Sequence, residues 1–305
     1  MTGEDTLFEC IDLHTHSTAS DGSDAPEKIP ETAAEAGLRA VALTDHDTVA
    51  GIPAFLEAGK RFPLLECIPG VELAALYGSR ELHIVGLFID HSSPALAGYL
   101  AKQREMRRRR NEDIRARLNI LGYSTSWSDE AFAGRDPSTV GRPHFALHLV
   151  KNHGFADSRR VFDRLLGHSR PAYVPRKLPV VKEAIAAIHA AGGVAVWAHP
   201  VYRERNETAW LRRVARHLVH AGLDGIEGYY SMFSPAETAI VTEVASIHDL
   251  AVSGGSDYHG TNSSAIRMGT GMGGLRVPYG LLEKLKAKKH AVSPQINTDG
   301  GNESI

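Results

Sequence analysis

The stretch of this sequence best equipped for chemistry is IDLHTHSTASD, residues 11–21. Two histidines, His14 and His16, stand one residue apart, and Asp21 follows five residues after the second. Imidazole nitrogens and carboxylate oxygens are common ligands of divalent transition metals. Because the apolar residues before His14 have the length of a buried strand, the pattern predicts metal ligands at the carboxyl end of a strand.

Further histidines and carboxylates lie in or next to other strand-like runs. They are His46 after RAVALTD, Glu72 in IPGVEL, His83 in LHIVG, His199 after VAVWA, and Asp257 and His259 after SGGS. His83 opens its run instead of closing it, so either this strand is antiparallel or its boundary lies elsewhere. Taken one at a time, such residues are more often helix caps or hydrogen-bonded structural residues.

The complete set contains six imidazoles and three carboxylates. Gathering them in one place without a cation would bury several charged groups, each at a cost on the kcal/mol scale, so the set predicts a metal cluster. Nine mixed nitrogen and oxygen ligands suit two or three ions of Mn, Fe or Zn. Because multinuclear sites of this kind hold both oxygens of a displacement at phosphorus, the cluster predicts a hydrolase of phosphate esters.

The elements that would position these residues alternate along the chain. Strand-like apolar runs occupy residues 8–13, 39–44, 65–74, 82–89, 193–198, 223–230 and 250–256, and they have the appearance of buried parallel strands. Amphipathic helical stretches lie at residues 26–37, 49–60, 180–191, 207–221 and 235–248. The alternation predicts an α/β barrel, in which the carboxyl ends of the strands meet and build the site.

The alternation stops in the middle of the chain, where the sequence becomes Arg-rich and helical. We expect residues 92–170 to form a small helical subdomain inserted into a barrel made of residues 1–91 and 171–290. Its first helix should run from about Pro94 to Leu121 and end at Gly122. The polar residues 291–305 show no periodicity and are expected to be a flexible tail.

Charge and hydropathy exclude several classes of protein. A formal net charge of −2 gives no overall attraction to nucleic acid or to an anionic membrane. No apolar run has the ~18 residues of a spanning helix, and MTGEDTLFEC lacks the basic and apolar parts of a secretory signal. We therefore expect a cytoplasmic protein without a membrane partner, and no obligate protein partner is evident. The run RRRR, residues 107–110, has acidic neighbours and predicts a mostly solvated charged surface.

Seven features of the sequence, taken in order, resemble the motifs of the PHP (polymerase and histidinol phosphatase) family of metal-dependent phosphoesterases. They are HTHS (14–17), Asp21, TDHD (44–47), GVEL (70–73), LHIVG (82–86), AHP (198–200) and SDYHG (256–260). The resemblance covers residues 8–90 and about 171–270. It implies a distorted (β/α)7 barrel with three divalent ions, with Mn²⁺ as the expected metal and Fe²⁺ or Zn²⁺ as alternatives. Asp257, Glu72 and His199 are then the expected catalytic residues.

The resemblance also implies how the ligands divide among the ions, as follows. The first ion would take His14, His16, Glu72 and Asp257, the second Glu72, His83 and His199, and the third Asp21, His46 and His259. In this arrangement Glu72 bridges two ions. No ligand position departs from the motif pattern of the family.

The barrel with a helical insert further resembles a subgroup that removes the 3′-phosphate of nucleoside 3′,5′-bisphosphates, or that trims RNA from its 5′ end. The expected substrate is therefore a small nucleotide, with short 5′-phosphorylated RNA as an extension. Polar residues of the insert and the following segment are the candidates for binding a phosphate away from the metals: Arg135, Ser138, Arg142, His144, Arg176 and Lys177. An Arg fork beside a helix N-terminus suits a phosphate group, although these arginines could equally be surface charges.

Other functions remain open on the sequence. The same centre could hydrolyse histidinol phosphate or another small phosphate ester. A non-catalytic nucleic-acid-binding module could use the Arg-rich insert, but the intact ligand set argues against it. An amidohydrolase would also have a His-rich barrel, yet no lysine follows a predicted strand to serve as a carbamylated bridge.

Overall fold

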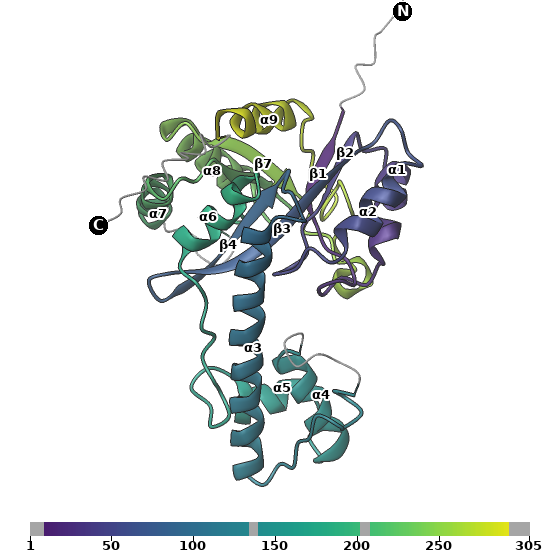
Figure 1. The fold of residues 1–305 in the computed structure, drawn as a ribbon, viewed down its shortest axis with the longest axis vertical. Helices are drawn as coiled ribbons and strands as arrows, with labels where there is room; N and C mark the ends of the chain where they lie inside the picture. Colours follow the sequence, from purple (N-terminus) through teal and green to yellow (C-terminus); the bar gives the residue numbers. More distant parts are fainter. Residues whose placement is uncertain (1–8, 134–139, 202–207, 293–305) are drawn as a thin grey trace, which may run out of the picture. The chain divides into compact units, whose positions relative to one another are not determined.

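The computed structural model describes residues 9–133, 140–201 and 208–292. The chain forms two compact units, residues 1–97 with 180–305, and residues 98–179. In the first unit the described residues form one seven-stranded sheet whose strands follow one another in sequence order (Figure 1). The strands are β1 (Ile11–Thr15), β2 (Ala40–Leu43), β3 (Glu66–Tyr77), β4 (Arg80–Leu87), β5 (Val194–Trp197), β6 (Gly225–Tyr230) and β7 (Ala251–Gly255). The prediction of seven strands is confirmed.

The first and last strands nearly close the sheet into a barrel. Beyond the end of β7, the Asp257 N–H donates to the His14 carbonyl oxygen at 2.9 Å, and the His16 N–H donates to the Tyr258 carbonyl oxygen at 2.8 Å. Thr15 and Tyr258 form a parallel bridge. These contacts hold the segment of His14 and His16 against the segment of Asp257 and Tyr258, and they confirm the barrel fold.

One strand departs from the parallel arrangement, and it is the strand of His83, for which an antiparallel direction was one of two alternatives. β4 is antiparallel to both β3 and β5, whereas the other neighbouring pairs are parallel. The start of β4 therefore lies at the same edge of the sheet as the ends of its neighbours. This resolves the anomaly of His83, because a residue that opens a reversed strand reaches the edge where the other strands end.

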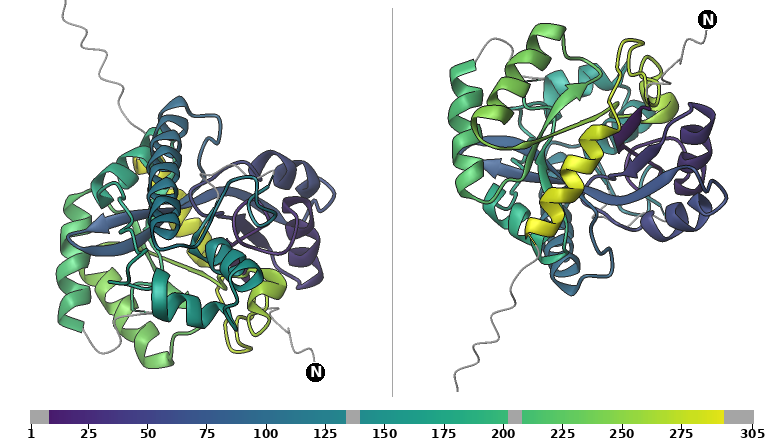
Figure 2. Two further views of the ribbon diagram at one scale, coloured as in Figure 1. Left: turned by 90° about the horizontal axis from the view of Figure 1, so that it is seen from below. Right: turned by 90° about the horizontal axis from the view of Figure 1, so that it is seen from above.

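Helices of the first unit cover the outside of the barrel (Figure 2). They are α1 (Ile29–Glu35), preceded by the 3₁₀ turn η1 (Pro26–Lys28), and α2 (Ile52–Gly59), α6 (Val181–Ala190), α7 (Thr208–His220) and α8 (Pro235–Ile247). The five predicted helical stretches are confirmed to within a few residues. In β2 the side chains alternate, with Ala40 and Ala42 in the barrel interior and Val41 and Leu43 packed with α1 and α2.

The last helix, α9 (Gly280–Val292), closes one end of the barrel. Leu282 and Leu285 are fully buried among interior side chains of the strands, and Figure 2 shows α9 lying across the sheet. Lys286 donates to Glu66, the first residue of β3, at 2.8 Å. Because α9 covers the end where β3 begins, the opposite end, where most strands finish, is left for the site. A 3₁₀ turn at that end, η3, spans Gly260–Ser263.

The second unit has a hydrophobic core of its own. Its helices are most of α3 (Pro94–Ile120), together with α4 (Arg142–Asn152) and α5 (Ser158–Val161), which continues into the π-helical turn η2 (Phe162–Leu166). Phe132 and Phe145 are fully buried in this core. The helix predicted to end at Gly122 does so, since Gly122 has the positive φ of 86° that favours glycine. Among the described helices, none is long and apolar enough to cross a membrane.

Candidate metal centre

Glu72 lies at the middle of the histidine cluster and is completely buried. Its two carboxylate oxygens face different groups of imidazoles. Oε2 lies 2.8 Å from His46 Nδ1, 3.3 Å from His14 Nε2 and 3.4 Å from His16 Nε2, while Oε1 lies 2.8 Å from His83 Nδ1 and 3.1 Å from His199 Nε2. One carboxylate thus joins five imidazoles from four separate segments of the chain.

The reversed strand and the side-chain alternation explain how Glu72 and His83 meet. Glu72 of β3 pairs with Val85 of β4 in the register of the two strands. Residues two apart in a strand point to the same face, so His83 lies on the face that carries Glu72. The bridge between His46 and Glu72 brings the segment after β2 to the same place.

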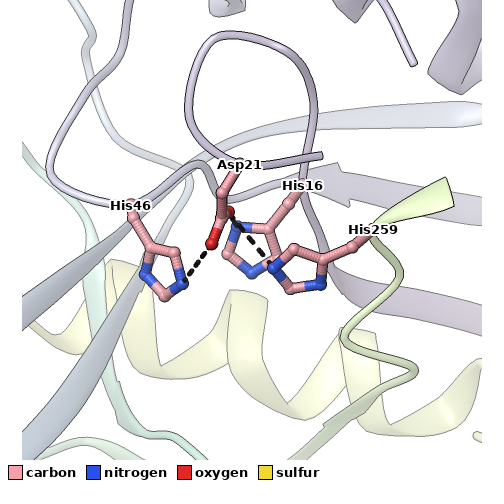
Figure 3. Close-up of side chains that lie close together, drawn as sticks. All are labelled: His16, Asp21, His46 and His259. Carbon is pink, nitrogen blue, oxygen red and sulfur yellow. Dashed lines mark ion pairs between the residues drawn. The ribbon is translucent and has the colours of Figure 1, made fainter. Parts of the chain in front are cut away.

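Asp21 organises a second part of the cluster (Figure 3). Its Oδ1 lies 3.2 Å from His259 Nε2 and 3.9 Å from His16 Nδ1, and its Oδ2 lies 3.8 Å from His46 Nε2. Ligand atoms of these four side chains all lie within 4.8 Å of one another. His16 and His46 therefore border both the Asp21 group and the Glu72 group.

Asp257 completes the cluster from the segment after β7. Its Oδ1 lies 3.2 Å from His16 Nε2 and 3.6 Å from His14 Nε2, and its Oδ2 accepts a hydrogen bond from the Tyr230 hydroxyl at 2.9 Å. Both Asp257 and His199 have positive φ, 59° and 31°. Such conformations cost free energy in residues with a Cβ and concentrate at functional sites. The structure thus brings all nine candidate ligands predicted from the sequence into one cluster.

Several buried atoms of the cluster suit a cation. His14 Nε2, both ring nitrogens of His16, and Glu72 Oε2 have no hydrogen-bond partner among the described residues. His14 Nδ1 lies 3.0 Å from a Glu227 oxygen, and because a carboxylate only accepts, Nδ1 carries the hydrogen. In the neutral ring, Nε2 then directs a lone pair toward the carboxylate oxygens of Glu72 and Asp257. A nitrogen lone pair and carboxylate oxygens that face one another repel unless a cation lies between them. These side chains are therefore suited to binding a metal ion.

The charges of the cluster are strongly coupled. Burial alone would raise the pKa of Glu72, but the surrounding imidazoles of His46, His83 and His14 hold it well below its usual range. Burial opposes protonation of His83, yet the Glu72 carboxylate outweighs burial and raises the pKa of His83 to about 10. Metal ions must therefore displace protons from these imidazoles, which makes metal binding dependent on pH.

Three buried carboxylates near the cluster were not predicted from the sequence. Glu227, in β6, bonds to His14 and to the backbone of His199.

Asp45 accepts hydrogen bonds from the Ser17 N–H at 2.7 Å and from the Ser17 and Ser20 hydroxyls at 2.7 and 2.6 Å. These bonds fix the turn before Asp21. Asp12 accepts from the N–H groups of Ser256 and Gly269 at 2.8 and 2.7 Å. The available signal was an acidic residue within an apolar strand, as in IDLH and GIEG.

Arg142, the first residue of α4, is firmly held inside the second unit. Its Nη1 donates to the Leu166 carbonyl oxygen at 3.2 Å, and its guanidinium lies 5.5 Å from the Tyr173 ring centroid and 5.7 Å from that of Phe162. The Gly141 N–H donates to His144 Nδ1 at 3.1 Å, so this ring caps the helix. The predicted phosphate-binding residues Arg135 and Ser138 lie outside the described residues.

A concentration of positive charge surrounds Arg142. Burial lowers the pKa of Arg110 to about 10, and the nearby Arg142 and Arg176 contribute to this shift. Arg110 donates to the Val174 carbonyl oxygen at 2.9 Å. Within the run predicted to be mostly solvated, Arg110 is half-buried, whereas Arg109 is exposed and pairs with Glu105. Lys177 follows Arg176 in the segment that leads back toward α6.

A cavity of about 220 Å³ opens beside the cluster within the first unit. His83 and His199 line it, together with Arg80, Trp210 and Tyr230. The cluster is therefore accessible from one side, as a catalytic centre must be.

Comparison with known proteins identifies relatives over most of the chain. A family model described as PHP domain matches residues 12–176. The 5′-3′ exoribonuclease Rnm of Salmonella typhimurium is 38% identical over 257 residues, which cover 84% of this chain and 87% of the relative. The 3′,5′-nucleoside bisphosphate phosphatase of Chromobacterium violaceum is 35% identical over 254 residues, covering 82% and 87%. A solved structure from Bifidobacterium adolescentis, named as a metal-dependent phosphoesterase, is similar with a TM-score of 0.74 at 28% identity, covering 92% and 96%.

Proposed function

The chain belongs to the PHP family of metal-dependent phosphoesterases, and from this premise we propose that it hydrolyses the 3′-phosphate of nucleoside 3′,5′-bisphosphates. The products are a nucleoside 5′-monophosphate and phosphate. The observation that carries the proposal is the cluster of nine imidazole and carboxylate side chains, in which four buried nitrogen and oxygen atoms lack a hydrogen-bond partner among the described residues. The names of the two relatives support the nucleotide substrate.

We assign the nine side chains to three divalent ions. The first would be held by His14, His16, Glu72 and Asp257, the second by Glu72, His83 and His199, and the third by Asp21, His46 and His259. The distances around Glu72 support its bridging role, since Oε2 faces His14, His16 and His46 while Oε1 faces His83 and His199. The mixed nitrogen and oxygen set suits Mn²⁺, with Fe²⁺ and Zn²⁺ also accepted.

Bound ions of this kind supply Lewis acidity, which lowers the pKa of water and neutralises charge on the phosphoryl group. The reaction adds a water oxygen to phosphorus and breaks the bond between phosphorus and the 3′-oxygen, which leaves as a hydroxyl. Asp257 Oδ1 is the proposed acceptor for a proton of the attacking water. His14 and His16 hold the pKa of Asp257 well below its usual range despite burial, so the carboxylate is ionised. The Tyr230 hydroxyl orients it through Oδ2.

Short 5′-phosphorylated RNA is the natural extension of this substrate. Its first nucleotide carries a 5′-phosphate and a phosphoester at the 3′-oxygen, as a 3′,5′-bisphosphate does. Hydrolysis at that 3′-oxygen releases a nucleoside 5′-monophosphate and leaves a new 5′-phosphate on the shortened RNA. One specificity for the 5′-phosphate would then serve both substrates.

A comparison of substrates tests the proposal directly. We expect the Mn²⁺-loaded protein to convert adenosine 3′,5′-bisphosphate to AMP and phosphate with a kcat/KM at least roughly tenfold above that for histidinol phosphate, a difference of about 1.4 kcal/mol. Release of AMP and phosphate is followed by chromatography. Faster hydrolysis of histidinol phosphate would favour a small-ester phosphatase. Binding of RNA that weakens steeply with salt, without any turnover, would indicate a non-catalytic module instead.

We further propose that the positively charged group around Arg142 binds the 5′-phosphate. Its members are Arg142, His144, Arg176 and Lys177, with Arg135 and Ser138 beside them in the sequence. The anchoring of Arg142 by Leu166 and two aromatic rings supports this role, because a guanidinium held in place loses little entropy when it binds a phosphate.

Replacing Arg142 should therefore affect only substrates with a 5′-phosphate. A charge-assisted hydrogen bond contributes about 1.5–3 kcal/mol, so Arg142→Ala is expected to raise KM for adenosine 3′,5′-bisphosphate roughly 10- to 100-fold. Hydrolysis of adenosine 3′-monophosphate, which lacks the 5′-phosphate, should stay nearly unchanged. Arg109→Ala, at an exposed arginine paired with Glu105, is the matched control. An equal loss on both substrates would contradict the assignment.

A further inference from the structure

Glu227 is a buried strand residue whose two oxygens serve different parts of the cluster. It lies in β6 and is 2% exposed. Oε1 lies 3.0 Å from His14 Nδ1, and Oε2 accepts a hydrogen bond from the His199 N–H at 2.7 Å. Both of its oxygens thus have partners within the chain, and Glu227 is not one of the nine side chains assigned to the ions. Glu227 therefore contacts His14 and His199, which are proposed ligands of two different ions, but it is not itself a proposed ligand.

The contact with His14 determines which ring nitrogen faces the cluster. Because the Glu227 carboxylate only accepts, His14 must donate from Nδ1. Its Nε2 then lies 3.3 Å from Glu72 Oε2 and 3.6 Å from Asp257 Oδ1. The contact therefore fixes the tautomer of the ring. A hydrogen bond at the far nitrogen also raises the basicity of a ligating imidazole.

The contact with His199 holds a strained piece of backbone. His199 has a φ of 31°, which is unfavourable for a residue with a Cβ. The hydrogen bond from its N–H to Glu227 is made within this conformation. The ring of His199 reaches Glu72 Oε1 at 3.1 Å, so a relaxation of the backbone would move the ring away from Glu72.

From this geometry we infer that Glu227 is a positioning residue that sets the metal affinity of the centre by holding His14 and the His199 backbone in place. One Glu227 oxygen contacts a proposed ligand of the first ion, His14, and the other contacts the backbone of a proposed ligand of the second ion, His199. The inference rests on the metal-ligand roles proposed for His14 and His199. It concerns ion binding by the chain and is independent of which phosphate ester is the substrate.

The same chain contains a matched carboxylate away from the cluster. Asp224, immediately before β6, accepts from the Ala195 N–H at 2.8 Å and lies 2.8 Å from His189 Nε2. Like Glu227, it joins an imidazole to a backbone N–H group, and it is 8% exposed. Neither His189 nor Ala195 belongs to the metal cluster. Asp224→Asn therefore measures the structural cost of losing such a contact without any effect on the ions.

The test is Mn²⁺ binding by equilibrium dialysis and metal analysis. Loss of a partner behind the ligands typically weakens metal binding about 10- to 100-fold, and this is the expected result for Glu227→Gln. The amide can accept from only one of the two donors, and its NH₂ opposes the other. Glu227→Asp, which keeps the charge on a shorter side chain, should bind with intermediate affinity and also serves if the glutamine variant does not fold. Asp224→Asn should bind Mn²⁺ as the wild type does.

The possible results separate the inference from the proposed function. If the wild type binds no Mn²⁺, the proposed metal centre fails. If the wild type binds Mn²⁺ and both Glu227 variants bind it equally well, only the role of Glu227 is overturned. An equal loss in Asp224→Asn would show a general structural effect and would also overturn it. Weaker binding by the Glu227 variants alone supports the inference, whatever substrate is hydrolysed.

Discussion

Glu72→Gln is expected to lower kcat/KM for phosphoester hydrolysis by roughly 10³-fold or more, which corresponds to about 4 kcal/mol of transition-state free energy. Glutamine has nearly the same shape as glutamate but lacks the charge, and its NH₂ group would face imidazole nitrogens that the carboxylate now faces. Both Glu72 oxygens lie within 3.4 Å of histidine nitrogens, so one substitution disturbs the first and second proposed ion sites together. Steady-state kinetics and metal content, measured on the same preparation, test this.

Glu66→Gln provides a control on the same strand. Glu66 is the first residue of β3 and pairs with Lys286 at 2.8 Å, at the end of the barrel opposite the cluster. A partly exposed pair contributes about 0–1 kcal/mol to stability and nothing to the chemistry, so activity should stay within about twofold of the wild type. If Glu72→Gln kept more than a tenth of wild-type activity with its ions bound, Glu72 could not be the bridging ligand.

The fold could be predicted from the sequence because each strand is a short apolar run followed by an amphipathic helix. The direction of β4 could not be predicted from apolarity, because a strand buried on both faces has the same composition in either direction. A local signal did exist. Gly78 and Ser79 alone separate β3 from β4, and Gly78 has a φ of 61°, as a two-residue hairpin turn requires. Such a turn forces antiparallel pairing.

The candidate ligands could be recognised because histidines or carboxylates recur in or next to six strand-like runs, whereas the residues that hold them in place could not. Glu227 and His14 are separated by 213 positions in the sequence, so only the closed barrel shows that they meet. Asp45 could be taken for a helix cap until its bonds to Ser17 and Ser20 are seen. The sequence also could not show which arginine of residues 107–110 is half-buried, because four consecutive residues point to all sides of a helix.

Removing the metals is the second change with a large expected effect. Treatment with a chelator should reduce turnover to background, and added Mn²⁺ should restore it. Thermal unfolding should change as well, because an ion at about 100 times its dissociation constant stabilises the folded protein by about 2.7 kcal/mol. At roughly 2–4 °C per kcal/mol for a unit of this size, one such site raises Tm by about 5–10 °C. Activity and Tm are measured with chelator and then with excess Mn²⁺. Activity unaffected by exhaustive chelation would contradict a metal-dependent reaction.

The stabilisation by Mn²⁺ should increase with pH. In the metal-free protein the Glu72 carboxylate raises the pKa of His83 to about 10, and the carboxylates of Asp21 and Asp257 raise that of His259 to about 9. In the unfolded chain both imidazoles titrate near 6.5. The metal-free protein therefore has the full stabilisation from these protonated rings below about pH 6.5 and loses it progressively as pH rises toward 9–10. Bound ions replace those protons, so the loaded protein should not show this loss.

Thermal unfolding at pH 6.5, 7.5 and 8.5, with and without Mn²⁺, measures this effect. The gap in Tm between the loaded and metal-free forms should widen at each step. His16 changes in the opposite sense, since burial lowers its pKa to about 4, but its contribution lies below pH 6.5 and leaves this window unaffected. A constant gap would mean that the ions do not compete with the protons of His83 and His259. That result would place the ions elsewhere in the protein, because ligands that hold protons in the metal-free state must release them to bind a metal.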